Sequence, residues 1–113
     1  MHELGIVYEV IKVVETFAEA NKLVEVSKIV LEIGQLSQAV PRFIKECYPA
    51  AVDGTRFENT DLEIILVPAI GCCKGCGVEY NIITYQKTCP ECHGQTFELI
   101  SGKEFSIKEV LAC

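Results

Sequence analysis

The 113-residue sequence lacks the features of several protein classes. It contains no run of 18 apolar residues, which argues against a membrane-spanning helix. Lys and Arg number 10 against 16 Asp and Glu, and this net charge of −6 disfavours nucleic-acid binding, because neutralising phosphates requires basic side chains. Met1-His2-Glu3-Leu4 lacks the basic stretch that opens a secretory signal, so we expect a cytoplasmic protein. The common phosphate-binding, nucleophile and zinc-protease motifs are missing, so we expect no enzyme.

The hydrophobic pattern predicts two helices and a small sheet. Apolar residues recur at helical spacing over residues 3–20 and 40–51, and they alternate over 23–33 and 62–67. Shorter strand-like runs cover 96–100 and 104–111. We expect Ser37 to cap the second helix and Pro49 to stop or kink it near Tyr48.

These elements predict an α+β fold in which two helices pack on a small three-stranded sheet. A zinc-ribbon-like domain is inserted before the last strand. We expect one unit over residues 1–69 and 102–113 and a second over 70–101. The linkers near Ala69-Ile70 and Ser101-Gly102 are short, so we expect hinge motion there. Such linkers would also permit two chains to exchange their last strands, so a domain-swapped homodimer is an alternative to a monomer.

Two C-x2-C segments dominate the insert and indicate a metal site. Cys73 and Cys76 form the first, and Cys89 and Cys92 form the second. Each spacing places two thiolates at one turn, and four sulfurs suit a tetrahedral metal. A segment this short cannot bury a core alone, so metal binding should supply much of its folding energy. We expect a structural site, because a catalytic zinc needs an open position.

The residues alone leave several points of this site open. Zinc is favoured, but iron also accepts four sulfurs, so a rubredoxin-like electron carrier is an alternative. A zinc-ribbon protein-interaction module is another. Cys72 and His93 adjoin the ligand cysteines and could take part. Gly77 and Gly94 follow the two turns, and we expect them to relieve steric strain there.

The N-terminus offers a second set of metal ligands. The Met1 α-amine, the His2 amide nitrogen and the His2 ring nitrogen Nδ1 can close fused five- and six-membered chelate rings. Nitrogen ligands of this kind suit Ni(II) or Cu(II). The α-amine has an ordinary pKa of about 7.7–8, so its deprotonation costs little near neutral pH.

The combination of these features resembles the HypA family of nickel metallochaperones. The resemblance rests on the opening Met1-His2-Glu3, the segment Leu31-Glu32-Ile33-Gly34-Gln35-Leu36-Ser37 and the two cysteine turns. It implies transient Ni(II) at His2, with the Met1 amine and Glu3 nearby, and structural Zn(II) held by Cys73, Cys76, Cys89 and Cys92. The implied partners are a HypB-type nickel-handling GTPase and the hydrogenase large subunit, with urease accessory proteins as a further class.

Overall fold

The computed structural model describes residues 2–112, and the side chains of residues 3–112. The elements are α1 (His2–Ala20), β1 (Val26–Gly34), α2 (Pro41–Val52), β2 (Asp61–Val67), β3 (Ile70–Cys73), β4 (Glu79–Asn81), β5 (Phe97–Ser101) and β6 (Phe105–Ala112). The described part of the chain contains no helix that is both long and apolar enough to cross a membrane.

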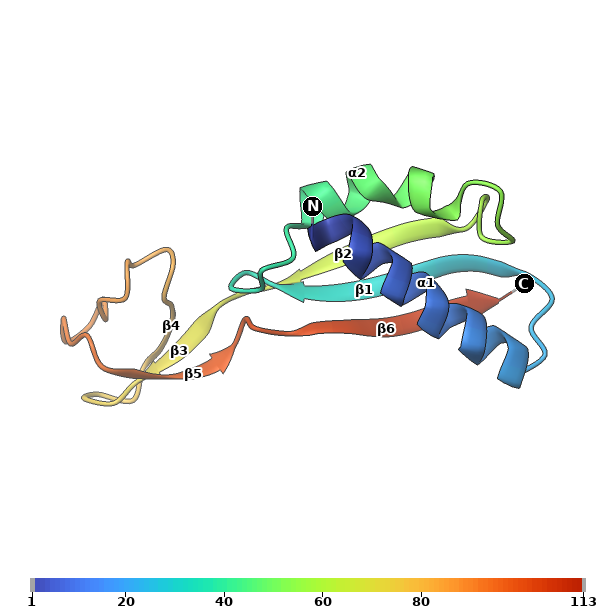
Figure 1. Ribbon diagram of the computed structural model, residues 1–113. Helices are drawn as coiled ribbons and strands as arrows, with labels where there is room; N and C mark the ends of the chain where they lie inside the picture. The colour runs from blue at the N-terminus through green and yellow to red at the C-terminus, as the bar shows by residue number, and fades with distance from the viewer. Residues whose placement is uncertain (1, 113) are drawn as a thin grey trace.

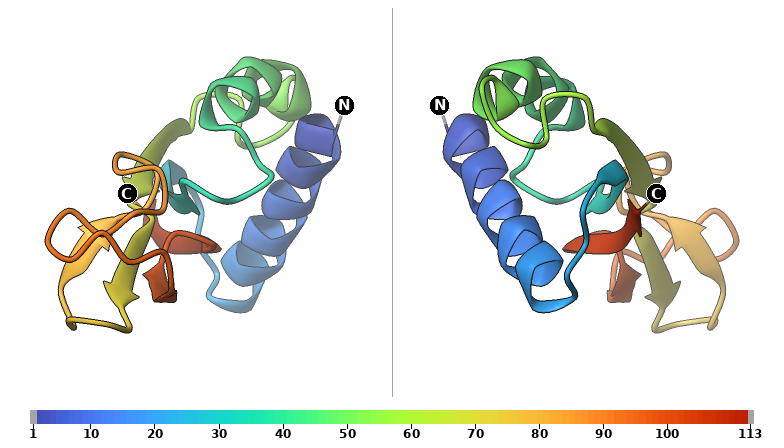
Figure 2. Two further views of the ribbon diagram at one scale, coloured as in Figure 1. Left: turned by 90° about the vertical axis from the view of Figure 1, so that its left-hand side faces the viewer. Right: turned by 90° about the vertical axis from the view of Figure 1, so that its right-hand side faces the viewer.

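Strands β2, β1 and β6 form one sheet with β1 in the centre. β1 pairs with β2 in parallel, from Lys28 opposite Asp61 to Gly34 opposite Val67, and it pairs with β6 antiparallel. A parallel pair needs a crossover connection, which α2 supplies. Both helices lie on one face of this sheet (Figure 1, Figure 2).

The core lies between this face and the helices, and it follows the predicted pattern. Ile29, Leu31 and Ile33 alternate along β1, and all three are fully buried. Val14 and Ala18 cover them from the apolar stripe of α1. Burial of these side chains is the main source of stability for such a small domain.

The second sheet has the order β4-β3-β5, and both of its strand pairs are antiparallel. It lies at one end of an elongated molecule that measures 54 × 28 × 16 Å (Figure 1). The side chains of this sheet and its loops form a separate apolar cluster, which includes Tyr80, Ile82 and Phe97. The predicted α+β class, with two helices on a three-stranded sheet and a ribbon-like insert, is confirmed.

Helix α2 differs from the prediction at both ends. It begins at Pro41 without a side-chain cap, and Ser37 instead accepts a hydrogen bond from the Ala39 amide at 3.1 Å. Pro49 does not stop the helix, which continues to Val52 because that turn is buried in the core. The predicted Ser37 cap and the predicted stop near Tyr48 were therefore wrong: no side chain caps the first turn, and burial of the last turn outweighs the missing Pro49 donor.

Candidate metal centre

The two C-x2-C segments fold into equivalent turns. Each turn closes with one hydrogen bond from the first cysteine's amide and a second that returns to its carbonyl. These bonds measure 2.8–2.9 Å and join Cys73 N to Val78 O, Gly77 N to Cys73 O, Cys89 N to Gly94 O, and His93 N to Cys89 O. These backbone hydrogen bonds therefore set the direction of the sulfur-bearing side chains.

The two turns use different residues at the position that needs a left-handed backbone. The φ angle is 78° at Gly77 but 62° at His93, whereas Gly94 has no such angle. Gly94 relieves crowding in the second turn through its small size, since a Cβ there would lie 3.3 Å from the Cys92 sulfur. The left-handed position of that turn is taken by His93 instead.

The four predicted cysteines come together. Their Sγ atoms all lie within 4.8 Å of one another, with 3.4 Å between Cys73 and Cys92 and 3.6 Å between Cys76 and Cys89. All four are free thiols rather than disulfides. Sulfurs bound to one tetrahedral zinc at about 2.3 Å lie about 3.8 Å apart, so this cluster fits a single four-coordinate ion.

Crowding separates the pKa values of these thiols. The Cys76 amide, followed by the Cys92 thiol, lowers the pKa of Cys73 to about 6. The Val78 amide acts in the same direction on Cys76, but the Cys89 thiol and burial outweigh it and raise that pKa to about 12. The Cys73 thiolate is thus available at neutral pH, whereas Cys76 would lose its proton only when a divalent cation binds.

The second sheet encloses one side of the cluster. Cys73 and Cys89 are buried, whereas Cys76 and Cys92 are exposed. Tyr80 packs beside the sulfurs and meets Phe97 edge to face, with 6.3 Å between ring centroids. Its hydroxyl is buried and has no hydrogen-bond partner among the described residues.

The neighbouring candidates lie outside the four-sulfur group. The Cys72 sulfur is 3.5 Å from the Gly77 carbonyl oxygen, and His93 is exposed. Among the described side chains, no other group of three or more His, Cys, Asp or Glu residues is close enough to hold a metal ion. The geometry therefore points to the four cysteines without Cys72 or His93.

The predicted nickel ligands lie at the edge of what the structure describes. Met1 and the side chain of His2 fall outside the described residues. The backbone of His2 starts α1, and Glu3 is half-buried in its first turn. The nickel site therefore remains a prediction.

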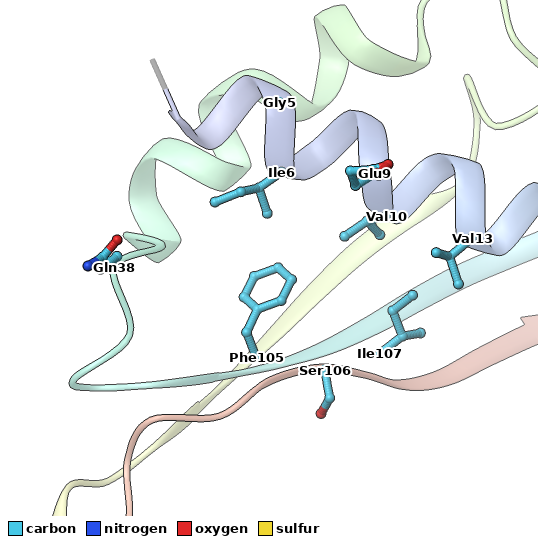
Figure 3. Close-up of a pocket in the computed structure, with 9 residues that line it drawn as sticks. All are labelled: Gly5, Ile6, Glu9, Val10, Val13, Gln38, Phe105, Ser106 and Ile107. Carbon is cyan, nitrogen blue, oxygen red and sulfur yellow. The ribbon is translucent and has the colours of Figure 1, made fainter.

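A cavity of about 540 Å³ lies between the N-terminal half of α1 and β6 (Figure 3). Its walls are mainly apolar and include Ile6, Val10, Phe105 and Ile107. Among the described residues that line it, Glu9 alone has a titratable side chain. The cavity therefore offers neither a set of metal ligands nor a nucleophile with its base.

The sequence of this chain also matches a known protein family. Residues 1–112 match the family described as hydrogenase/urease nickel incorporation metallochaperone HypA. The chain belongs to the HypA family. Relatives named hydrogenase maturation factor HypA include those of Rippkaea orientalis, 39% identical, and Geobacter sulfurreducens, 36% identical. Each alignment covers 97% of this chain, and it covers 94% and 97% of the two relatives.

Solved structures support the same fold. The solution structure of the Ni metallochaperone HypA from Helicobacter pylori matches with a TM-score of 0.65 and 19% identity over 97% of this chain and 96% of that one. Another HypA solution structure matches with a TM-score of 0.70 over 100% of this chain and 97% of that one. The resemblance read from the sequence motifs is thus confirmed, and the four-cysteine cluster is consistent with the zinc site that it implied.

Proposed function

We propose that this chain binds Ni(II) at its N-terminus and delivers it for the maturation of [NiFe]-hydrogenase, with urease as a further target class. In this proposal Cys73, Cys76, Cys89 and Cys92 hold a structural zinc ion. The observation that carries it is a four-sulfur cluster with a complete ligand set in a chain of the nickel-incorporation family. A site filled by four thiolates has no open position, so an ion meant for transfer requires a different site.

The N-terminal chelate supplies ligands suited to that transfer. The Met1 amine and the His2 amide and imidazole nitrogens are ligands that Ni(II) accepts, and Glu3 is a further donor in the same turn. Ligand donation requires a neutral imidazole, so nickel affinity should fall as pH drops through the pKa of His2. An ion held at the chain end can pass to an incoming ligand set without unfolding the domain.

The zinc ion has a different task in this proposal. The apolar cluster of the second sheet is small, and Cys73 and Cys89 are themselves part of it. Bound zinc would ionise the remaining thiols and join the two turns, so its binding free energy becomes folding free energy for residues 70–101. We assign residues 1–69 and 102–113 to the nickel-binding unit and residues 70–101 to the zinc-binding unit.

The partners follow from the family's role. Two relatives are named hydrogenase maturation factors, and this chain would receive or hand over nickel within the same process. We assign it a HypB-type GTPase and the hydrogenase large subunit as partners, with urease accessory proteins as a further class. In this role the chain carries a metal in the cytoplasm and catalyses no reaction.

Nickel titration of zinc-loaded protein without an affinity tag tests the proposal. We expect His2→Ala to lose high-affinity nickel binding while retaining one zinc per chain. His93→Ala is the matched control, because it removes the only other histidine, and it should bind nickel like the unmodified protein. Equal nickel affinity in the unmodified protein and His2→Ala would contradict the proposal.

The same preparation tests the iron alternative. Four thiolates accept iron as well as zinc, and an iron site of this type gives a visible charge-transfer absorption. We expect the purified protein to be colourless and to contain zinc by elemental analysis. A coloured protein with one iron per chain would favour a rubredoxin-like electron carrier instead.

A further inference from the structure

The segment 34–37, which begins at the last residue of β1, forms hydrogen bonds with both connections that lead to the second sheet. The Gln35 amide donates to the Val67 carbonyl at 2.9 Å, at the end of β2. The Leu36 amide donates to the Gly102 carbonyl at 2.7 Å, between β5 and β6. One short segment thus meets the entering and the leaving chain at the junction of the two sheets (Figure 1).

The side chain of Gln35 adds two hydrogen bonds to these backbone bonds. Its Oε1 accepts the Ala69 amide hydrogen at 2.8 Å and an Asn81 side-chain N–H at 3.0 Å. A backbone amide can only donate, so the atom that faces Ala69 must be the oxygen of the Gln35 amide. Ala69 is fully buried, and leaving its N–H without an acceptor would be costly.

Asn81 connects this oxygen to the cysteine-bearing part of the chain. Its Oδ1 accepts the amide hydrogens of Ile83 and Thr84, at 2.9 and 3.1 Å, in the turn after β4. The adjacent Tyr80 packs in the cluster that contains Cys73 and Cys89. An unbroken series of contacts therefore runs from the sulfur cluster to Gln35.

We propose that Gln35 is a positioning residue that holds the four-cysteine unit in one orientation relative to the helix-and-sheet unit. Two hydrogen bonds terminate on its single side-chain oxygen: one from Ala69 holds the linker before β3, and one from Asn81 crosses to the four-cysteine unit. While both bonds are made, the linkers at residues 68–70 and 101–103 cannot act as a free hinge. Loss of this oxygen releases the β1 end from Ala69 and Asn81 together. The inference does not depend on nickel binding at the N-terminus.

Two substitutions at this position separate the acceptor from the bulk of the side chain. Gln35→Leu keeps a similar volume but offers no acceptor to either donor. Gln35→Glu keeps an oxygen that can accept from both, since a carboxylate accepts on each of its oxygens. Gln38→Leu is the matched control, because Gln38 lies three residues away in the same loop and is exposed.

Residual dipolar couplings of the full-length, zinc-loaded protein measure the relative orientation of the two sheets. We expect one common alignment tensor for both sheets in the unmodified protein, Gln35→Glu and Gln38→Leu. In Gln35→Leu we expect the couplings of residues 70–101 to shrink by about half or more relative to those of the first sheet, as they do when a unit moves independently. Zinc stoichiometry and the chemical shifts within each sheet should stay unchanged.

A common alignment tensor of unchanged magnitude in Gln35→Leu would overturn the proposal. Equal loosening in Gln35→Glu would also overturn it, because the acceptor would then not be the decisive group. If Gln35→Leu does not fold, Asn81→Asp replaces it in the same measurement. That variant keeps the acceptor for Ile83 and Thr84 but removes the donor to Gln35, so unchanged couplings there would equally refute the role of Gln35.

Discussion

Substitution of Gly34 by alanine tests how tightly the junction of the two sheets is packed. A Cβ at Gly34 would fall inside the van der Waals radius of the Gly102 carbonyl and lie 2.8 Å from the Lys103 nitrogen. All of these neighbours are backbone atoms, so no side chain can rotate away. The end of β1 must therefore move away from the connection between β5 and β6.

That movement breaks identifiable interactions, so the cost can be worked out. The Gly34 amide donates to the Glu104 carbonyl, and the Leu36 amide donates to the Gly102 carbonyl, both at 2.7 Å. Leaving the buried Gly34 donor unpaired costs about 1–3 kcal/mol, and loss of the hydrogen bond from the exposed Leu36 adds about 0.5–1.5 kcal/mol. Residual crowding adds about 1–3 kcal/mol, so we expect Gly34→Ala to lower the free energy of unfolding by about 3–5 kcal/mol. This is a large share of the roughly 5–15 kcal/mol that stabilises a typical domain.

Urea unfolding followed by far-ultraviolet circular dichroism measures this loss on zinc-loaded protein. Gly5→Ala is the control, because a Cβ there meets nothing within 4 Å and the residue lies in α1. Alanine is the better helix former, so this variant should gain about 0.5–1 kcal/mol in the free energy of unfolding. A Gly34→Ala variant within 1 kcal/mol of the unmodified protein would refute the packing argument.

The remaining predictions concern pH, the ligand set and the second cysteine turn. Burial raises the pKa of Tyr48 to about 12 from an ordinary 10.0, so its neutral form stabilises the fold below pH 10. That contribution, at most about 2–3 kcal/mol, is lost between pH 10 and 12. In urea unfolding, the free energy of unfolding of Tyr48→Phe should therefore fall less over this range than that of the unmodified protein. Cys76→Ser should release zinc and unfold residues 70–101, whereas Cys72→Ser should keep one zinc per chain; retained zinc in Cys76→Ser would indicate another ligand set. His93→Gly should keep its zinc and raise the thermal midpoint, because glycine adopts the left-handed angle without strain; loss of zinc would make His93 a ligand.

Periodicity predicted the first sheet and its helices because their burial is one-sided over many residues. The α1 stripe recurs through five turns, so the preference of its β-branched residues for strands could not hide the helical pattern. In β1 the fully buried Ile29, Leu31 and Ile33 recur at every second residue. Pro49 shows the limit of such local rules. The buried turn after it keeps α2 helical to Val52.

Two of the three strands of the second sheet could not be predicted from periodicity. β3 and β4 contain four and three residues, too few for alternation to be recognised. The four cysteines were predictable because C-x2-C spacing by itself places two sulfurs at one turn. His93 was not predictable as the left-handed residue of its turn, since the pattern of residue types favours a glycine there.

The role of Gln35 illustrates what no local pattern contains. Its hydrogen-bond partners Ala69 and Asn81 lie 34 and 46 residues away along the chain. Only the packing of the two sheets brings them together. The motif that surrounds Gln35 was visible in the sequence, but the reason for a glutamine at this position required the fold.

X-ray absorption at the nickel and zinc edges, on protein loaded with one equivalent of each ion, tests the central claim that two ions occupy two chemically distinct sites. We predict four sulfur neighbours around zinc at about 2.3 Å, and only nitrogen and oxygen neighbours around nickel. Sulfur scattering around nickel, with a matching loss of sulfur around zinc, would show that both ions compete for the cysteine cluster and would contradict the account.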